Sequence, residues 1–391
     1  MKHKGLAICV AQVMLAGATI TVYSTHGTPP ATPAIHLLRT PNNGIQPQTV
    51  LERDGVLHMI YFTGDASAGE IEYVRRPPGG KDFSQPIRVN SQPASAVAIG
   101  AVRGPQMAVG RNGRAYVIWF GPQAHSGEGT ESMPVFFSRL NDSGTAFEPQ
   151  RNLMQYAKGG DGGISVAADM RGNVYGVWHA MGEQAGEDHR RVYLAHSTDD
   201  GRTFSREAAI SPAALGACGC CGMRSFADQN GTLYVLFRAA AQSIHRDIRL
   251  LISRDHGDTF RVENVAPWNV NACPMSTAYL TEGGQRVVAA WETEGEVYFD
   301  QIDPGPLKLS PPISAPAAGI NRKHPAVAAS ANRQLLVWTE GTGWSKGGSL
   351  GWQFFDNSGK PIGAAGHAPG LPVWGLPSAF ADDQGNFTIV Y

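Results

Sequence analysis

Apolar and polar positions alternate along the chain in a unit that returns many times. Each unit has an apolar stretch, a polar turn containing Gly or Asn, and a stretch of β-branched and aromatic residues, as in residues 109–119, 167–178, 226–237 and 379–391. Two short strands around a tight polar turn form a β-hairpin. The turns centre on Gly55, Gly113, Gly172, Gly231, Gly284, Asn332 and Gly385, with gaps of 58, 59, 59, 53, 48 and 53 residues.

Seven hairpins at this spacing predict an all-β protein, a β-propeller of four-stranded antiparallel blades in which each hairpin supplies the two inner strands. The last hairpin ends at Tyr391, so residues 35–39 are expected to add an outer strand and close the ring. Six blades are the alternative, with the last hairpin completing an earlier blade. The 47 Gly, 26 Pro and 17% charged residues suit a fold with many turns.

A second pattern repeats inside these units. Ser197-Thr-Asp-Asp-Gly-Arg-Thr-Phe204 returns as Ser253-Arg-Asp-His-Gly-Asp-Thr-Phe260, and weaker copies occupy residues 138–147 and 79–83. In such a turn the Asp accepts bonds from backbone amides and the Gly takes a positive φ. The residues that define it are Ser197, Asp199, Gly201, Thr203, Phe204, Ser253, Asp255, Gly257, Thr259 and Phe260.

This octapeptide resembles the Asp-box, or BNR repeat, of the sialidase superfamily. The resemblance implies a propeller and an exo-acting, sialidase-type glycosidase on glycans outside the cytoplasm. Such a site needs arginines from separate blades to bind a carboxylate, and carboxylic residues for the chemistry. The candidates are Arg103, Arg238, Arg246, Asp65 and Glu292. The family's Phe-Arg-Ile-Pro signature is absent. The most similar sequence, Gln85-Pro-Ile-Arg88, is expected in an outer strand.

The N-terminus has the pattern of an export signal. Lys2 and Lys4 precede an apolar run over residues 6–22, and a polar segment follows. We therefore expect residues 1–30 to be a signal peptide and leader, and residues 31–391 a single propeller domain that is secreted or periplasmic. The net charge of −1 gives no indication of a nucleic-acid partner or a membrane surface, and we expect a monomer.

Polar loops are expected to gather on one face of the propeller. In an antiparallel blade the start of the first strand and the loop after the second strand lie on the same side, opposite the hairpin turns. The starts of successive first strands contain Arg103, Asp161, Cys218, Cys220, Cys221, Cys273 and His324. We expect these side chains to face one another around the central channel, together with loops such as residues 125–131 and 179–190.

Four cysteines follow the expected signal, and three interpretations fit them. An exported chain most simply forms disulfides, for example between Cys218 or Cys220 and Cys273. A metal centre is the second interpretation, because Cys218, Cys220, Cys221, Cys273 and His324 form a soft donor set suited to copper or zinc. Cys221 with Met223, and Cys273 with Met275, share the two-residue spacing that places side chains on one side of a strand. A redox dithiol is the third.

Two classes of function therefore follow from the sequence. One is the sialidase-type glycosidase, which requires several arginines around a shared pocket. The other is a propeller without catalysis that binds a glycan, a protein or a metal, and its metal-binding form requires unpaired thiols within a few ångströms of one another.

Overall fold

The computed structural model describes residues 35–123, 133–283, 286–303, 305, 309–317, 319 and 321–391. The expected signal peptide and the loop of residues 125–131 lie outside these described residues. Pro33–Tyr391 form one compact unit. In the part of the chain that is described, no helix has the length and apolar character needed to cross a membrane.

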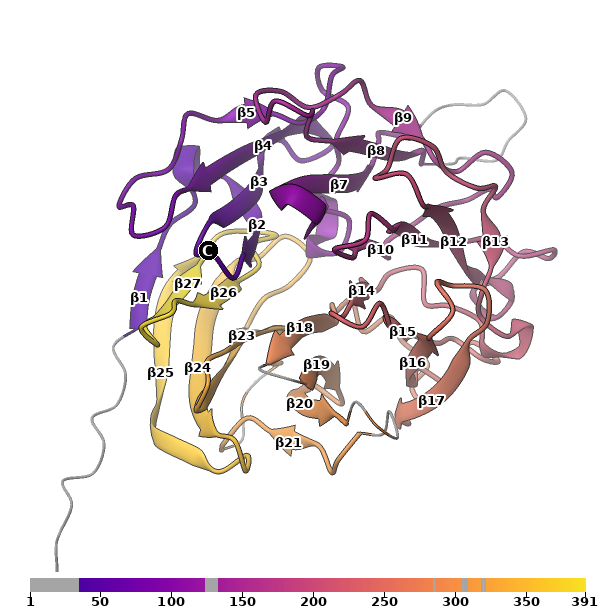
Figure 1. The fold of residues 1–391 in the computed structure, drawn as a ribbon. Helices are drawn as coiled ribbons and strands as arrows, with labels where there is room; N and C mark the ends of the chain where they lie inside the picture. The colour runs from indigo at the N-terminus through magenta and orange to yellow at the C-terminus, as the bar shows by residue number, and fades with distance from the viewer. Residues whose placement is uncertain are drawn as a thin grey trace, which may run out of the picture. The chain divides into compact units, whose positions relative to one another are not determined.

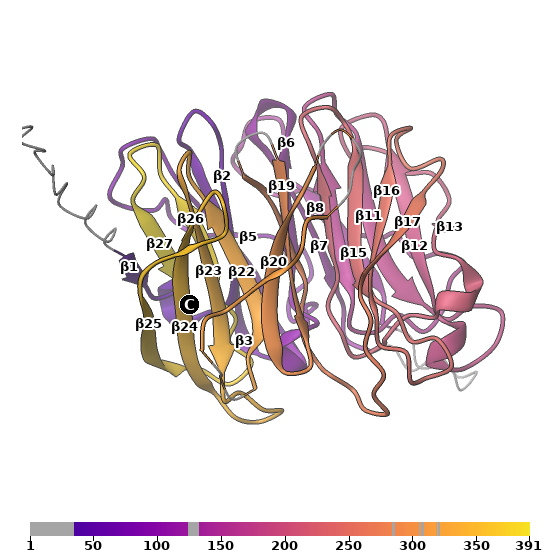
Figure 2. The ribbon, with the colours of Figure 1, turned by 90° about the horizontal axis from the view of Figure 1, so that it is seen from below.

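Seven sheets surround a central axis (Figure 1), as the hairpin count predicts. Seen from the side, the sheets stand next to one another and their strands run between two faces (Figure 2). We call the face where the first strand of each blade begins the start face. The opposite face, which has the turns between first and second strands, is the hairpin face.

Blades 1 to 3 each have four antiparallel strands. Blade 1 contains β2 (Ile45–Leu51), β3 (Leu57–Asp65), β4 (Ala68–Arg76) and β5 (Ile87–Arg88). Blade 2 contains β6 (Gln106–Gly110), β7 (Arg114–Phe120), β8 (Val135–Arg139) and β9 (Arg151–Asn152). Blade 3 contains β10 (Ile164–Ala168), β11 (Val174–Ala180), β12 (Arg191–Ser197) and β13 (Ala208–Ala209).

Blades 4 to 6 repeat this order. Blade 4 contains β14 (Arg224–Ala227), β15 (Leu233–Arg238), β16 (Ile248–Ser253) and β17 (Arg261–Ala266). Blade 5 contains β18 (Tyr279–Gly283), β19 (Arg286–Thr293), β20 (Glu296–Ile302) and β21 (Ile313–Ser314). Blade 6 contains β22 (Lys323–Ala329), β23 (Arg333–Glu340), β24 (Gly348–Asp356) and β25 (Pro361–Leu371).

The two ends of the described chain close the ring in blade 7. β26 (Ser378–Ala381) and β27 (Phe387–Val390) form the last hairpin, and β1 (Ile35–Leu38) pairs with β27 in parallel. The backbone N–H of Tyr391 donates to the carbonyl of Leu38 at 3.0 Å. The expectation for residues 35–39 is confirmed, but this blade has three strands instead of four.

Aromatic side chains at repeated positions fill the space between blades. Trp119, Trp178, Trp291 and Trp338 occupy the second strands of blades 2, 3, 5 and 6, and all four are fully buried. Phe237 takes the same place in blade 4. Burying such a ring stabilises the fold by roughly 1.5–3 kcal/mol, so the hydrophobic pattern of the second strands sets the blade-to-blade packing.

The two octapeptide turns have the same hydrogen bonds. Asp199 Oδ1 accepts from the N–H of Thr203 at 2.8 Å, and Asp255 Oδ1 accepts from the N–H of Thr259 at 3.0 Å. Partial burial opposes ionisation of Asp199, but the bonds from Thr203 hold its pKa at about 2. Phe204 packs edge-on against Phe137 of the preceding blade, with ring centroids 4.8 Å apart. These turns therefore join neighbouring blades.

One buried acid makes the stability of this fold depend on pH. Asp300 on β20 is 2% exposed, its Oδ2 has no hydrogen-bond partner among the described residues, and burial raises its pKa to about 7. The folded state keeps this proton up to neutral pH, whereas the unfolded state releases it near pH 4. Stability should therefore fall as pH rises from about 4 to 7.

Replacing Asp300 with Asn should remove this dependence. We expect D300N to be more stable than the wild type at pH 8 by about 2–4 kcal/mol and about equally stable at pH 4. Urea denaturation at several pH values measures the difference. Parallel pH profiles for the two proteins would contradict the expectation.

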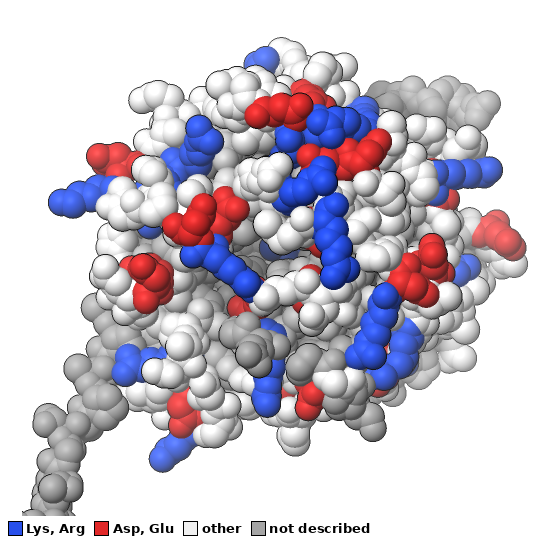
Figure 3. Space-filling model, in the orientation of Figure 1, with Lys and Arg blue, Asp and Glu red and all other residues white. Residues whose placement is uncertain are grey.

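The channel along the axis is wide at one end and narrow at the other. First strands of all seven blades line a pocket of about 950 Å³ that includes the hairpin turns. Figure 3 shows a hollow at the centre of this face, with charged side chains of both signs around it. Toward the start face the channel is narrow, and the pocket there has a volume of only about 40 Å³. Gln106, Arg224 and His324 are among its lining residues. The Arg224 guanidinium donates to Gln106 Oε1 at 2.8 Å.

Candidate metal centre

The cysteine triplet lies in a loop that leads into β14 and is fixed by backbone hydrogen bonds. The N–H of Cys218 donates to the carbonyl of Arg238 at 3.0 Å, and the N–H of Gly222 donates to the carbonyl of Ser276 at 2.9 Å. The N–H of Cys221 donates to the carbonyl of Cys218 at 3.3 Å, which closes a tight turn. The turn is therefore attached to blades 4 and 5.

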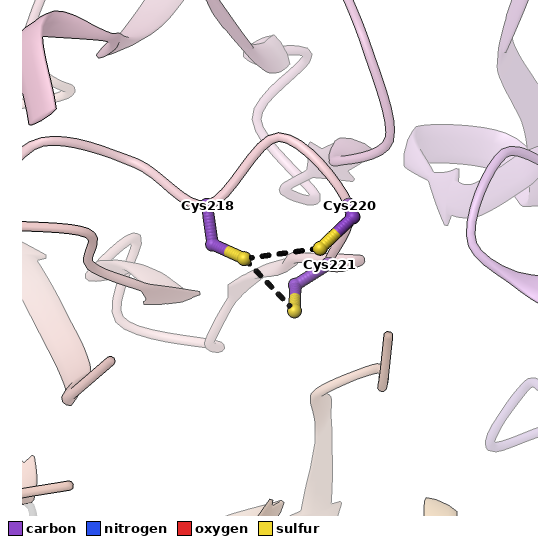
Figure 4. A group of neighbouring side chains, drawn as sticks. All are labelled: Cys218, Cys220 and Cys221. Atoms are coloured by element: carbon purple, nitrogen blue, oxygen red, sulfur yellow. Dashed lines mark hydrogen bonds between the residues drawn. The ribbon is translucent and has the colours of Figure 1, made fainter. Parts of the chain in front are cut away.

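This turn brings three sulfur atoms together. Cys218 Sγ lies 3.4 Å from Cys220 Sγ and 3.2 Å from Cys221 Sγ. Figure 4 shows the three sulfurs grouped on one side of the turn, with Cys218 Sγ joined to each of the other two. Cys218 is 0% exposed and Cys221 is 2% exposed, whereas Cys220 is partly exposed. We call Cys218, Cys220 and Cys221 the inner cluster.

Cys220 also belongs to a second group. Its Sγ, Cys273 Sγ and a carboxylate oxygen of Glu187 all lie within 4.8 Å of one another. Glu187 begins the short 3-10 helix η4 (Glu187–His189) in blade 3, and Cys273 lies in the loop before β18 of blade 5. Cys273 is exposed. We call Glu187, Cys220 and Cys273 the outer cluster.

Two arginines place positive charge beside these sulfurs. Arg246 forms an ion pair with Glu187 at 2.7 Å, and Arg238 forms one with Glu292 at 2.9 Å. Burial opposes ionisation of Cys221, but hydrogen bonds from Cys218 and Cys220, together with the charge of Arg238, hold its pKa well below the usual thiol value. The Cys221 thiolate is thus stabilised, whereas the pKa values of Cys218 and Cys220 are raised, chiefly by the hydrogen bonds among the three thiols and by burial. A bound cation would therefore have to displace the protons of Cys218 and Cys220.

Both buried histidines near the loop are uncharged. Burial, assisted by Arg190, lowers the pKa of His179 to about 4, and its Nε2 accepts from the N–H of Gly163 at 2.9 Å. Burial lowers the pKa of His324 to about 3. His324 lines the narrow channel and is not a member of either cluster among the described residues, so its role as a metal ligand stays a prediction. It lies within β22, whereas the cysteines precede their strands.

The expected disulfides are absent from the described residues. Cys218, Cys220, Cys221 and Cys273 are all free thiols. A disulfide needs sulfurs about 2.05 Å apart, and the sulfurs of the inner cluster are more than 1 Å farther apart than that. The prediction that Cys273 comes close to the triplet is confirmed through Cys220.

Each arginine among the sialidase candidates already forms an ion pair. Arg103 forms an ion pair with Asp161 at 2.7 Å, as their repeat positions predict. Arg238 and Glu292 neutralise each other, and Glu187 neutralises Arg246. The exposed Asp65 accepts a hydrogen bond from Ser67, and no ion pair joins it to an arginine among the described residues. Arg88 lies in β5, an outer strand, as expected.

Sequence reasoning missed two features of the site. Glu187 was grouped only with the long polar loop after the second strand of blade 3, and its contact with Cys220 depends on the local turn of η4. Arg238 pairs with Glu292 across the boundary to blade 5, whereas the nearby Asp247 pairs with Arg249 at 2.7 Å. The aligned repeats indicate that Glu187 and Arg238 lie on the same face of the propeller. They do not indicate which side chains these two residues contact.

Chemically, the inner cluster offers three soft donors inside a desolvated turn. Thiolates select Cu(I), zinc and iron–sulfur clusters over hard cations. A structural zinc site takes four ligands, and the fourth thiol, Cys273, approaches Cys220 but is not grouped with Cys218 and Cys221. Three sulfur donors without a fourth favour Cu(I).

No family model matches the chain, and no curated protein does. Solved structures do resemble it. A protein of unknown function from Dyadobacter fermentans DSM 18053 has a TM-score of 0.56 at 12% identity, over 82% of this chain and 97% of that one. The Hadza microbial sialidase Hz136 has a TM-score of 0.51 at 14% identity, over 81% and 69%.

A fucose-binding lectin from Aleuria aurantia, a six-bladed propeller, has a TM-score of 0.51 at 11% identity, over 85% of this chain and 96% of that one. The neighbours therefore include a sialidase and a lectin, but at such identities the likeness shows the fold alone. This chain has the β-propeller architecture of these proteins, with seven blades.

Proposed function

We propose that this protein is an exported propeller that holds a soft metal ion, Cu(I), in the inner cluster. The observation that carries the proposal is the convergence of three free sulfurs at 3.2 and 3.4 Å inside one buried turn. Thiols placed so closely in a fixed backbone are preorganised for one ion, because binding requires little further ordering of the chain.

Export adds a reason for a bound metal. Free thiols in a secreted or periplasmic protein are exposed to oxidation, and three thiols in contact would form a disulfide in the absence of another partner. A bound Cu(I) ion would occupy the sulfurs and keep them reduced. Localisation and metal content are thus linked parts of one proposal.

Metal titration tests the proposal. Full-length protein, reduced and kept without oxygen, is titrated with Cu(I) against the chromogenic chelator bicinchoninate, and Zn²⁺ is added in a parallel series. We expect one Cu(I) per chain, retained against excess Zn²⁺, and a rise in Tm on loading. Protein isolated from its natural compartment without metal, and with all four sulfurs oxidised, would overturn the proposal.

Hydrolysis of sialosides is the alternative that the octapeptide resemblance implies. We expect the protein to have no such activity. A carboxylate substrate would need guanidinium groups that are free to bind it, but Arg103, Arg238 and Arg246 each already bind an acidic side chain. A panel of fluorogenic sialosides measures the activity. Release of the fluorophore by the wild type, lost in Arg246→Ala protein that still folds, would instead establish a glycosidase.

A further inference from the structure

Cys220 belongs to both clusters, and the two clusters differ in exposure and in donor type. In the inner cluster two of the three sulfurs are buried. In the outer cluster Cys273 is exposed and the third donor is a carboxylate oxygen of Glu187. A soft ion prefers a thiolate to a carboxylate. The inner cluster should therefore bind Cu(I) more tightly than the outer cluster.

Glu187 is held in place rather than free to bind tightly. Its Oε2 pairs with Arg246 at 2.7 Å, and its Oε1 accepts from the N–H of Gly219 at 2.9 Å. Both carboxylate oxygens are thus already engaged, which weakens them as ligands. The same bonds attach Glu187 to the cysteine turn, so the two clusters keep a fixed relation to each other.

We propose that the outer cluster is a docking site through which Cu(I) enters and leaves the inner cluster. This inference rests on the proposed function of the inner cluster. Cu(I) is first bound by Cys273 and Cys220 near the surface. The Cys220–Cu bond is kept while the Cys273–Cu bond breaks and bonds to Cys218 and Cys221 form.

This exchange is balanced without a redox partner. Copper stays Cu(I) throughout, so no electrons are transferred. Cys220 and Cys273 release their thiol protons to solvent when they first bind copper, and any inner thiol that is still protonated does so as copper reaches it. The released Cys273 thiolate takes up a proton from solvent. Release of Cu(I) follows the reverse order, and a donor or acceptor of Cu(I) would meet Cys273 first.

Transfer kinetics test this route. Stopped-flow absorbance follows the movement of Cu(I) from the full-length protein to bicinchoninate, and the reverse reaction follows loading. In Cys273→Ser protein we expect both rates to fall by about tenfold or more, with equilibrium affinity and stoichiometry close to the wild type. Asn271→Ser, an exposed change in the same loop, is the matched control and should leave the rates unchanged.

Three results would separate the explanations. Transfer rates in Cys273→Ser equal to those of Asn271→Ser would overturn the docking role while leaving the inner cluster intact. A loss of affinity as large as that caused by Cys221→Ser would mean one four-sulfur site, which also contradicts the inference. Failure of the wild type to bind Cu(I) would instead remove the proposed function itself.

Rescue by a soft donor distinguishes a ligand from a structural residue. Cys273→Met keeps a sulfur that binds Cu(I) but is a poor ligand for harder ions. We expect it to restore a substantial part of the transfer rate lost in Cys273→Ser. Equal rates for the Met and Ser variants would show that the sulfur of Cys273 is not used in transfer.

Discussion

Replacing Cys221 with Ser is expected to lower the affinity for Cu(I) by more than about 100-fold, because even residues that only support metal ligands change affinity by 10–100-fold. Cys221 is buried and its thiolate is stabilised by the neighbouring thiols and by Arg238. Serine has nearly the same size, so the turn should still fold. Competition with bicinchoninate measures the change.

Met223 provides the control for this experiment. It lies two residues from Cys221, is buried, and packs against the hydrophobic core between blades 3 and 4. Met223→Leu keeps the packing but removes the thioether, and we expect unchanged Cu(I) affinity. Cys221→Ser protein that binds Cu(I) as tightly as the wild type would contradict the assignment of the inner cluster.

Replacing Arg238 with Met is expected to destabilise the fold by about 3–5 kcal/mol, because it leaves a buried charge without its partner. Glu292 is 1% exposed, and burial already raises its pKa even though Arg238 opposes the shift. Arg238 also donates to the carbonyls of Arg246 and Glu292 and lies 5.1 Å from the ring of Trp268. Urea denaturation at pH 7 gives the free energy of unfolding.

A double-mutant cycle separates charge from packing in this pair. Glu292→Gln should lower the free energy of unfolding by less than Arg238→Met does, because a neutral amide can remain in the site. The double variant R238M/E292Q should be more stable than the sum of the two single losses predicts, since no unpaired charge is left. Additive losses would show that the two side chains do not interact and that the ion pair contributes little.

The ring of blades follows from the sequence because its signals are local. Each hairpin needs only a polar turn such as Gly113 or Gly172 and a β-branched or aromatic stretch, and each is visible within a dozen residues. The closing strand also follows, since the last hairpin at Tyr391 lacks a partner that residues 35–39 can supply. The parallel direction of β1 against β27 could not be predicted, because it depends on how the two ends of the chain meet.

The site was less predictable because its contacts depend on loop geometry. Repeat alignment placed Cys221, Cys273 and His324 on one face, but each residue has a different distance from the start of its strand. Cys273 lies in an exposed loop, and His324 is inside β22 and faces the channel. The backbone of the loops between strands decides which of these side chains come into contact. The hydrophobic pattern of the sequence does not encode the conformation of those loops.

The most direct measurement is the X-ray absorption spectrum of the copper-loaded, full-length protein. We predict Cu(I) with a first shell of three sulfur atoms, reduced to two in Cys221→Ser and unchanged in Asn271→Ser. A first shell made of nitrogen and oxygen atoms would show that the inner cluster is not the site where copper binds.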